Sequence, residues 1–194
     1  VPSTTMTPLS ISPTIDPAQS PFKLRTFGDH ALARMVTEAQ RWLQTVSAAG
    51  FPYWLTLYGP SGTGKTHVAK ALWVEIRAFG MDYSRQTTYV PFFVHWPVFC
   101  DDLRGGRAYE RVADMRRWPC LFLDDIGCGR DATGFLADHL TTLLCARVGM
   151  WTCLTSNLTI PQIAAIDQRI VSRLIRDGGT MVHVETMDYA LRYV

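Results

Sequence analysis

Apolar residues recur along this chain with two different periods, and each period predicts a different kind of secondary structure. Between Asp29 and Gly50 they keep the spacing of one helix face, so this segment predicts an amphipathic helix that ends near the glycine. The predicted face consists of Leu32, Met35, Val36, Ala39, Trp42, Leu43 and Val46. Short, continuous apolar runs predict buried strands instead, and they lie at 53–58, 89–96, 120–123, 150–155 and 181–184. In the second run Pro91 places the usable part of the strand after that residue.

Helical spacing returns in the segments between these runs, at 68–79, 97–103, 136–144 and 167–176. The glycine pair that follows the last of these segments is expected to end its helix. Strands that alternate with helices are typical of an α/β domain built on a central parallel sheet.

A glycine-rich segment joins the first predicted strand to the helix at 68–79. Residues 59–66 read Gly-Pro-Ser-Gly-Thr-Gly-Lys-Thr and match G-x-x-x-x-G-K-[ST] at every fixed position. Glycines let successive backbone N–H groups point at one anion, and the N-terminus of the following helix adds partial positive charge. Lys65 can reach the outer phosphates, and the Thr66 hydroxyl can ligate Mg²⁺. We therefore expect a nucleoside triphosphate site made by Gly59, Pro60, Ser61, Gly62, Thr63, Gly64, Lys65, Thr66 and His67.

Two carboxylates follow the strand predicted at 120–123. In α/β sheets the carboxyl ends of the strands are where ligands bind, so Asp124 and Asp125 are expected beside the triphosphate. Asp124 would bind Mg²⁺ directly or through water, and Asp125 would orient or deprotonate the attacking water. Asn157 follows the next strand and could hold that water or sense the γ-phosphate, although an asparagine there is also a common turn former.

The densest basic segment of the chain lies between residues 104 and 117. It would contact the phosphate backbone of single-stranded nucleic acid, with the tyrosine available for base stacking. The other interpretation is a solvated helix face. The residues concerned are Arg104, Arg107, Tyr109, Arg111, Arg116 and Arg117.

Composition limits the remaining possibilities. With 194 residues, 47% hydrophobic and 19% charged, the chain suits one globular domain, and a net charge of +2 does not by itself indicate nucleic acid. Five cysteines without a C-x-x-C pair, four of them in or beside apolar runs, suggest buried free thiols in a reducing cytoplasm. No membrane span is expected, and the proline-, serine- and threonine-rich residues 1–21 predict a disordered tail.

Four motifs in this order resemble the AAA+ ATPases of the bacterial and phage replicative helicase loader group, the DnaC-like proteins, with IstB-like transposition ATPases as near relatives. The motifs are the phosphate loop and residues 121–127, 154–158 and 169–174. The likeness covers about residues 22–192, and it implies an AAA+ core at 22–194 with a parallel sheet flanked by helices. It also implies that the C-terminal helical lid is lacking, because about twenty residues follow Arg173.

The resemblance implies a role for individual residues. Lys65 and Thr66 match the phosphate and Mg²⁺ residues, and Asp124 with Asp125 match the second acidic motif. Asn157 matches the polar sensor. Arg173 matches the arginine finger that reaches a neighbouring subunit's nucleotide, with Arg169 as second choice, so an oligomer is implied.

The function expected from this resemblance is a slow, ATP- and Mg²⁺-dependent switch that binds single-stranded DNA and loads a replicative helicase. An ATPase that recruits a transposase to DNA fits the same motifs. A small-molecule kinase shares the phosphate loop, but the paired acids and the Thr-Ser-Asn at 155–157 favour the ATPases. A binding module without hydrolysis is disfavoured by the intact Lys65, Asp124 and Asp125.

Overall fold

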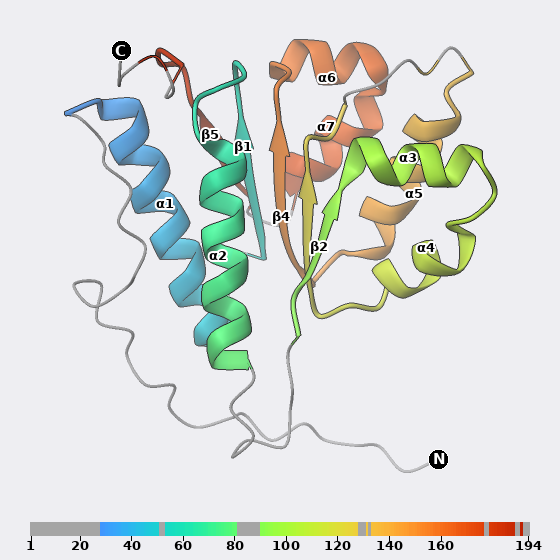
Figure 1. Ribbon diagram of the computed structural model, residues 1–194, viewed down its shortest axis with the longest axis horizontal. Helices are drawn as coiled ribbons and strands as arrows, with labels where there is room; N and C mark the ends of the chain where they lie inside the picture. Colours follow the sequence, from blue (N-terminus) through green and yellow to red (C-terminus); the bar gives the residue numbers. More distant parts are fainter. Residues whose placement is uncertain are drawn as a thin grey trace.

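Five parallel strands form one sheet in the order β2-β3-β4-β1-β5 (Figure 1). The computed structural model describes residues 28–50, 53–80, 90–127, 131, 133–176, 179–188 and 191, so the tail expected at 1–21 lies outside the described residues. The central parallel sheet expected from the sequence is thereby confirmed. Its strands are β1 (Trp54–Tyr58), β2 (Phe92–His95), β3 (Cys120–Asp124), β4 (Trp151–Ser156) and β5 (Thr180–His183).

Helices cover both faces of this sheet (Figure 1). One face is covered by α1 (His30–Ser47) and α2 (Lys65–Gly80). The other face carries α3 (Trp96–Arg104), α4 (Tyr109–Met115), α5 (Phe135–Ala146), α6 (Ile160–Ile166) and α7 (Gln168–Ile175). Among the described residues, no helix is long and apolar enough to cross a membrane.

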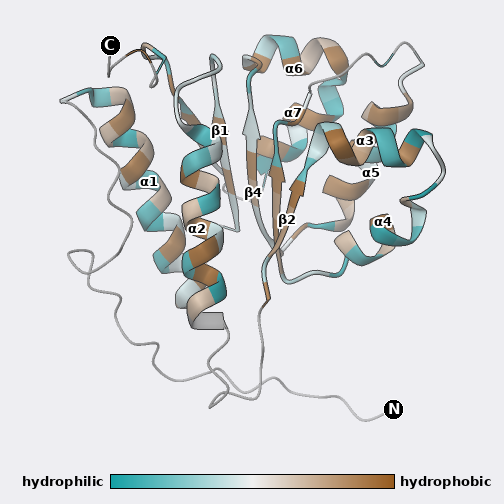
Figure 2. Cartoon of the chain, in the orientation of Figure 1, coloured by the Kyte–Doolittle hydropathy of each residue, from teal (hydrophilic) through white to brown (hydrophobic). Residues whose placement is uncertain are grey.

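Successive strand residues pack into two separate cores, one on each face of the sheet. Leu55 and Leu57 of β1 pack against α1 and α2. Trp54 points to the opposite face of the sheet and packs with the core under the other helices. Strands buried on both faces read as continuous apolar runs rather than as alternation, which is why the runs were visible in the sequence. Figure 2 shows hydrophobic, brown stretches within the strands beside paler residues, and helices that carry both hydrophobic and hydrophilic residues.

The structure differs from the sequence-based expectation in three places. β2 begins at Phe92, after Pro91 as expected, but its expected end, Trp96, opens α3 instead. Helix α6 was not anticipated. Only Ile163 among its seven residues is buried, so the helix has no periodic pattern of buried apolar residues. Of the thiols expected to be buried, Cys145 is exposed, while Cys100, Cys120 and Cys153 are buried.

Strand order brings the candidate motifs together. β4 lies between β1, which enters the phosphate loop, and β3, which carries the acids. The register pairs Tyr58 with Ser156 and Leu123 with Leu154, so the three strands end at the same edge of the sheet. Asn157, which follows β4, is therefore placed between the loop and the acids.

Candidate functional site

The phosphate loop connects β1 to α2 and folds around its own lysine. Positive φ angles at Gly59, Gly62 and Gly64 give the loop its curvature, which glycine adopts without steric cost. The Lys65 side chain is buried, and its Nζ donates to the carbonyl oxygens of Gly59 at 2.8 Å and Pro60 at 2.5 Å. The ammonium thus lies inside the loop among carbonyl oxygens, which a phosphate oxygen can replace as its partner.

A pocket of ≈ 470 Å³ opens above this loop. Its described lining combines the phosphate loop with residues from α2, from the end of β4 and from the segment after β5. Cationic side chains of Lys65 and Lys70 face the same space, which favours a polyanionic ligand. The lining residues are Ser61, Gly62, Thr63, Gly64, Lys65, Thr66, His67, Lys70, Asn157 and Asp188.

The hydroxyl of the loop and the first acid meet directly. Thr66 Oγ1 donates to Asp124 Oδ1 at 2.8 Å, although the two residues come from α2 and β3. A hydroxyl and a carboxylate oxygen this close are hard oxygen donors, and Mg²⁺ at phosphate sites is bound by few protein ligands together with water and phosphate. The residues present therefore fit a magnesium ion that Thr66 and Asp124 would hold.

Thr155 on β4 holds both acids, a role that its place in the Thr-Ser-Asn at 155–157 did not predict. Its Oγ1 donates to Asp124 Oδ1 at 2.7 Å and accepts from the Asp125 backbone N–H at 2.8 Å. The residue is buried and its neighbour Ser156 is also buried, with its hydroxyl donating to the Ile126 carbonyl at 2.8 Å. Thr155 and Ser156 are adjacent hydroxyl residues at the carboxyl end of the strand, and this pair was the signal that could have identified both of them.

Asp125 and Asn157 form a second polar pair at the same edge. Asn157 Nδ2 donates to Asp125 Oδ1 at 2.6 Å, so the amide fixes the orientation of the carboxylate. The Asp125 backbone has φ of 64°, a left-handed conformation that aspartate tolerates better than most residues. The chain therefore leaves the extended conformation of β3 at Asp125. The two carboxylates have different partners, since Asp124 accepts from Thr66 and Thr155 and Asp125 accepts from Asn157.

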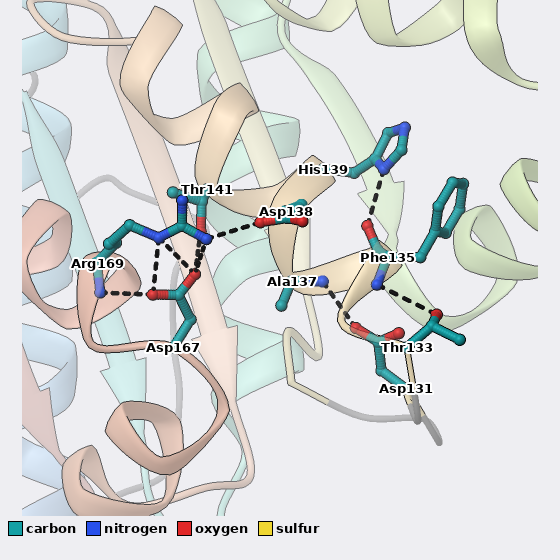
Figure 3. A network of polar contacts seen from close by, with 9 residues as sticks. All are labelled: Asp131, Thr133, Phe135, Ala137, Asp138, His139, Thr141, Asp167 and Arg169. Carbon is teal, nitrogen blue, oxygen red and sulfur yellow. Dashed lines mark hydrogen bonds and ion pairs between the residues drawn. The ribbon is translucent and has the colours of Figure 1, made fainter.

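The two candidate arginines on α7 have different environments, although they are one helical turn apart. Figure 3 shows Arg169 joined to Asp167 at the start of α7 and to Asp138 on α5. Hydrogen bonds to these carboxylates raise the pKa of Arg169, and the bond from Arg169 in turn lowers the pKa of Asp167. Within the described residues, no hydrogen bond or ion pair engages Arg173, which remains partly exposed.

The basic segment is partly neutralised by acids of α3. Arg104 pairs with Asp101 at 3.2 Å, and Arg107 and Arg111 both lie within 3.4 Å of Asp102. Arg116 and Arg117, after α4, are exposed and make no ion pair within the described part of the chain.

Tyr109 is 55% exposed and lies 6.3 Å, between ring centroids, from His139 of α5. The structure therefore presents an exposed aromatic ring at the start of α4 and, among the residues described, two cations without an ion pair after its end, rather than one uniform patch of five arginines.

Comparison with known proteins shows which proteins this chain is similar to in sequence and in fold. No protein-family model matches the sequence. The chromosomal replication initiator protein DnaA of two Porphyromonas gingivalis strains is 29% identical over 142 residues, which is 70% of this chain. The chain spans 28% of the length of these curated relatives.

Solved structures share the fold over most of the chain. DnaI superposes with a TM-score of 0.59 at 21% identity and covers 79% of this chain and 83% of its own. The DnaC helicase loader has a TM-score of 0.60 at 18% identity, over 81% of this chain and 92% of its own. AMPPCP-bound DnaA from Aquifex aeolicus reaches 0.59 at 21% identity, over 80% of this chain and 47% of its own.

Proposed function

We propose that this chain, which has the α/β core of an AAA+ ATPase, is an ATP-dependent helicase loader that binds single-stranded DNA and a replicative helicase. The observation that carries the proposal is the contact between Thr66 of the phosphate loop and Asp124 of β3 at 2.8 Å. It assembles an oxygen site for Mg²⁺ beside the loop, as ATP hydrolysis requires. The likeness to DnaI and DnaC supports the choice of a loader.

In this proposal each polar residue at the sheet edge has one task. Lys65 and the loop N–H groups bind the phosphates, and Thr66 and Asp124 would hold Mg²⁺ beside them. Asp125, oriented by Asn157, positions the attacking water and accepts its proton. A bound Mg²⁺ would neutralise the negative charge that develops as water attacks the γ-phosphoryl group and ADP leaves.

Arg173 completes the site of a neighbouring subunit. The contrast on α7 supports this assignment over Arg169, since Arg169 is held by two carboxylates of its own chain and would have to break both ion pairs to reach a nucleotide. An arginine finger contributes about 10³ to 10⁵ in rate, so an isolated subunit is expected to hydrolyse ATP slowly. ATP binding then orders the subunit interface, and hydrolysis releases it.

Subunit mixing tests the arginine finger. Arg173→Ala should bind ATP normally but hydrolyse it poorly, and adding Asp125→Asn subunits, which supply an intact Arg173, should restore turnover in the mixture. Arg169→Ala is the matched control on the same helix and should retain more activity than Arg173→Ala. Failure of the mixture to recover activity would contradict action between subunits.

Single-stranded DNA would contact the exposed side of the segment from 104 to 117. The pairing pattern supports Arg116, Arg117 and Tyr109 as the main contacts, because Arg107 and Arg111 already neutralise Asp102. Each phosphate contact on a single strand contributes about −0.7 to the slope of log K against log salt. Arg116→Ala with Arg117→Ala should therefore reduce that slope by about 1.4, and Arg104→Ala with Arg107→Ala should reduce it less.

The decisive experiment is a pull-down of the purified protein against a replicative helicase and, in parallel, a transposase. Each is measured with ATP, with ADP, and with and without single-stranded DNA, using Lys65→Ala as the variant that cannot hold nucleotide. ATP-dependent capture of the helicase that Lys65→Ala abolishes is the expected result. Capture of the transposase alone would indicate a transposition ATPase and contradict the loader function. Transfer of phosphate to a small molecule in place of hydrolysis would indicate a kinase.

A further inference from the structure

The segment after β5 lies beside the phosphate loop. It contacts the end of β1, the first glycine of the loop and the residue that caps α1. The Val184 N–H donates to the Tyr58 carbonyl at 2.8 Å, which continues the pairing of β5 with β1. The Val184 carbonyl packs against Gly59, where a Cβ atom would lie 2.5 Å away. Further along, the Thr186 hydroxyl donates to Asp29, the residue that caps α1.

Asp188 then places its carboxyl group over the loop at Gly62. A Cβ atom at position 62 would overlap the Asp188 carboxyl group, so in this arrangement the carboxyl group occupies the space that a side chain at position 62 would need. The motif G-x-x-x-x-G-K-[ST] leaves position 62 open to any residue, and here it is a glycine with φ of 74°. Loop and tail are therefore shaped to fit each other at a position that phosphate binding alone does not require to be glycine.

Asp188 also has an electrostatic effect on the pocket. It is the one carboxylate among the described residues that line the pocket above the loop, where Lys65, Lys70 and His67 also lie. A nucleoside triphosphate carries several negative charges into that space, and a carboxylate within a few ångströms opposes them. The opposing energy grows with the number of phosphates, whereas a purely steric contact would not depend on charge.

We propose that Asp188 sets the affinity of the nucleotide site, weakening the binding of polyphosphates in proportion to their charge. The proposal rests on the proposed function in that the ligand is ATP and the product ADP. The repulsion is larger for ATP than for ADP. Asp188 therefore lowers the affinity for ATP more than the affinity for ADP and reduces the ratio between the two. Rotation of the Asp188 side chain out of the pocket would relieve the repulsion, so nucleotide binding is coupled to the position of this side chain.

The first test compares Asp188→Asn with the wild-type chain by titration calorimetry with ATP and with ADP. Removing one charge at this distance should tighten ATP binding by about tenfold at low salt and ADP binding by less. The difference between variant and wild type should shrink as salt screens the charges. Glu185→Gln is the matched control, because Glu185 is three residues away and exposed, and its affinities should remain those of the wild type.

The second test uses Gly62 to detect the contact itself. Gly62→Ala strains a positive φ whatever lies nearby, and it should also push the Asp188 carboxyl group away. In the Asp188→Gly background only the strain remains, so Gly62→Ala should disturb nucleotide affinity and thermal stability less there than in the wild-type chain. Equal effects in both backgrounds would show that the contact is not formed and would overturn the proposal.

The outcomes separate this inference from the proposed function. Wild-type protein that binds ATP while Asp188→Asn binds it equally or more weakly removes the inference and leaves the ATPase intact. If neither protein binds any nucleotide, the proposed function is wrong, and the inference that rests on it is wrong as well. If only Asp188→Asn binds measurably, the inference is supported in its strongest form.

Discussion

Replacing Thr155 by valine removes one hydroxyl from the centre of the candidate site and almost nothing else. The hydroxyl donates to Asp124 Oδ1 at 2.7 Å and accepts from the Asp125 N–H at 2.8 Å, and the residue is buried. A hydrogen bond to a charged group contributes about 1.5–3 kcal/mol, and the unpaired N–H adds about 1 kcal/mol. Since valine fills nearly the same volume, no cavity term is expected, and the free energy of unfolding should fall by about 3 kcal/mol.

Urea denaturation of the nucleotide-free protein measures this change, with Thr155→Ser as the control that keeps the hydroxyl. The serine variant should lose no more than about 1.5 kcal/mol, which is the contribution of the buried methyl group. A double-mutant cycle with Asp124→Asn isolates the Thr155–Asp124 bond, because the loss from Thr155→Val should shrink once the carboxylate is neutral. ATP turnover should also fall in Thr155→Val, since both acids lose a partner that fixes their position.

Two results would refute this reasoning. A Thr155→Val protein as stable as Thr155→Ser would mean that the hydroxyl is not buried between the acids. Equal losses in the wild-type and Asp124→Asn backgrounds would mean that the hydroxyl stabilises the fold without contacting Asp124.

Other expectations concern the remaining strained, buried and reactive groups. Asp125→Asn should leave ATP affinity and unfolding free energy within about 1 kcal/mol of wild type, because asparagine also tolerates a left-handed backbone, while turnover in a phosphate-release assay collapses. Arg147→Met should lower thermal stability strongly, by about 3 kcal/mol or more, since the buried guanidinium donates to the carbonyls of Met115, Trp118 and Trp151 and methionine leaves these acceptors unpaired. Burial lowers the pKa of Arg147 to about 10, so the group stays charged at pH 7 and calorimetric stability should show no step from it between pH 6 and 8. Burial raises the pKa of Cys100 and Cys120 to about 12, which keeps both thiols protonated at pH 8, and native maleimide labelling read by mass spectrometry should modify Cys145 before either of them.

Local chemistry was sufficient to predict the phosphate loop and the strands around it. The loop is a contiguous motif whose glycines, lysine and threonine act through neighbouring backbone, so their spacing alone specifies the structure. Strands buried on both faces appear as continuous apolar runs, and four of the five were located to within about two residues. The end of β2 was missed because Trp96 continues its apolar run although it opens α3, and α6 was missed because its apolar face is weak.

The partners of these residues were decided by tertiary structure. Asp167 lies only two residues before Arg169 in the sequence. It is the tertiary structure that brings Asp138 of α5 alongside α7, where it adds a second ion pair to Arg169 and none to Arg173. Acids of α3 likewise neutralise three of the five arginines that looked like one basic patch.

The sequence by itself determined that this protein has a loop able to cradle phosphates and acids at a strand end, because both depend on residues adjacent in the chain. Only the tertiary structure decided that β4 lies between them, that Thr155 joins Asp124 to Asp125, and that Asp188 covers Gly62. Strand order and the path of the tail are set by packing across the whole sheet. Contacts between residues so distant along the chain leave no periodic trace in the sequence.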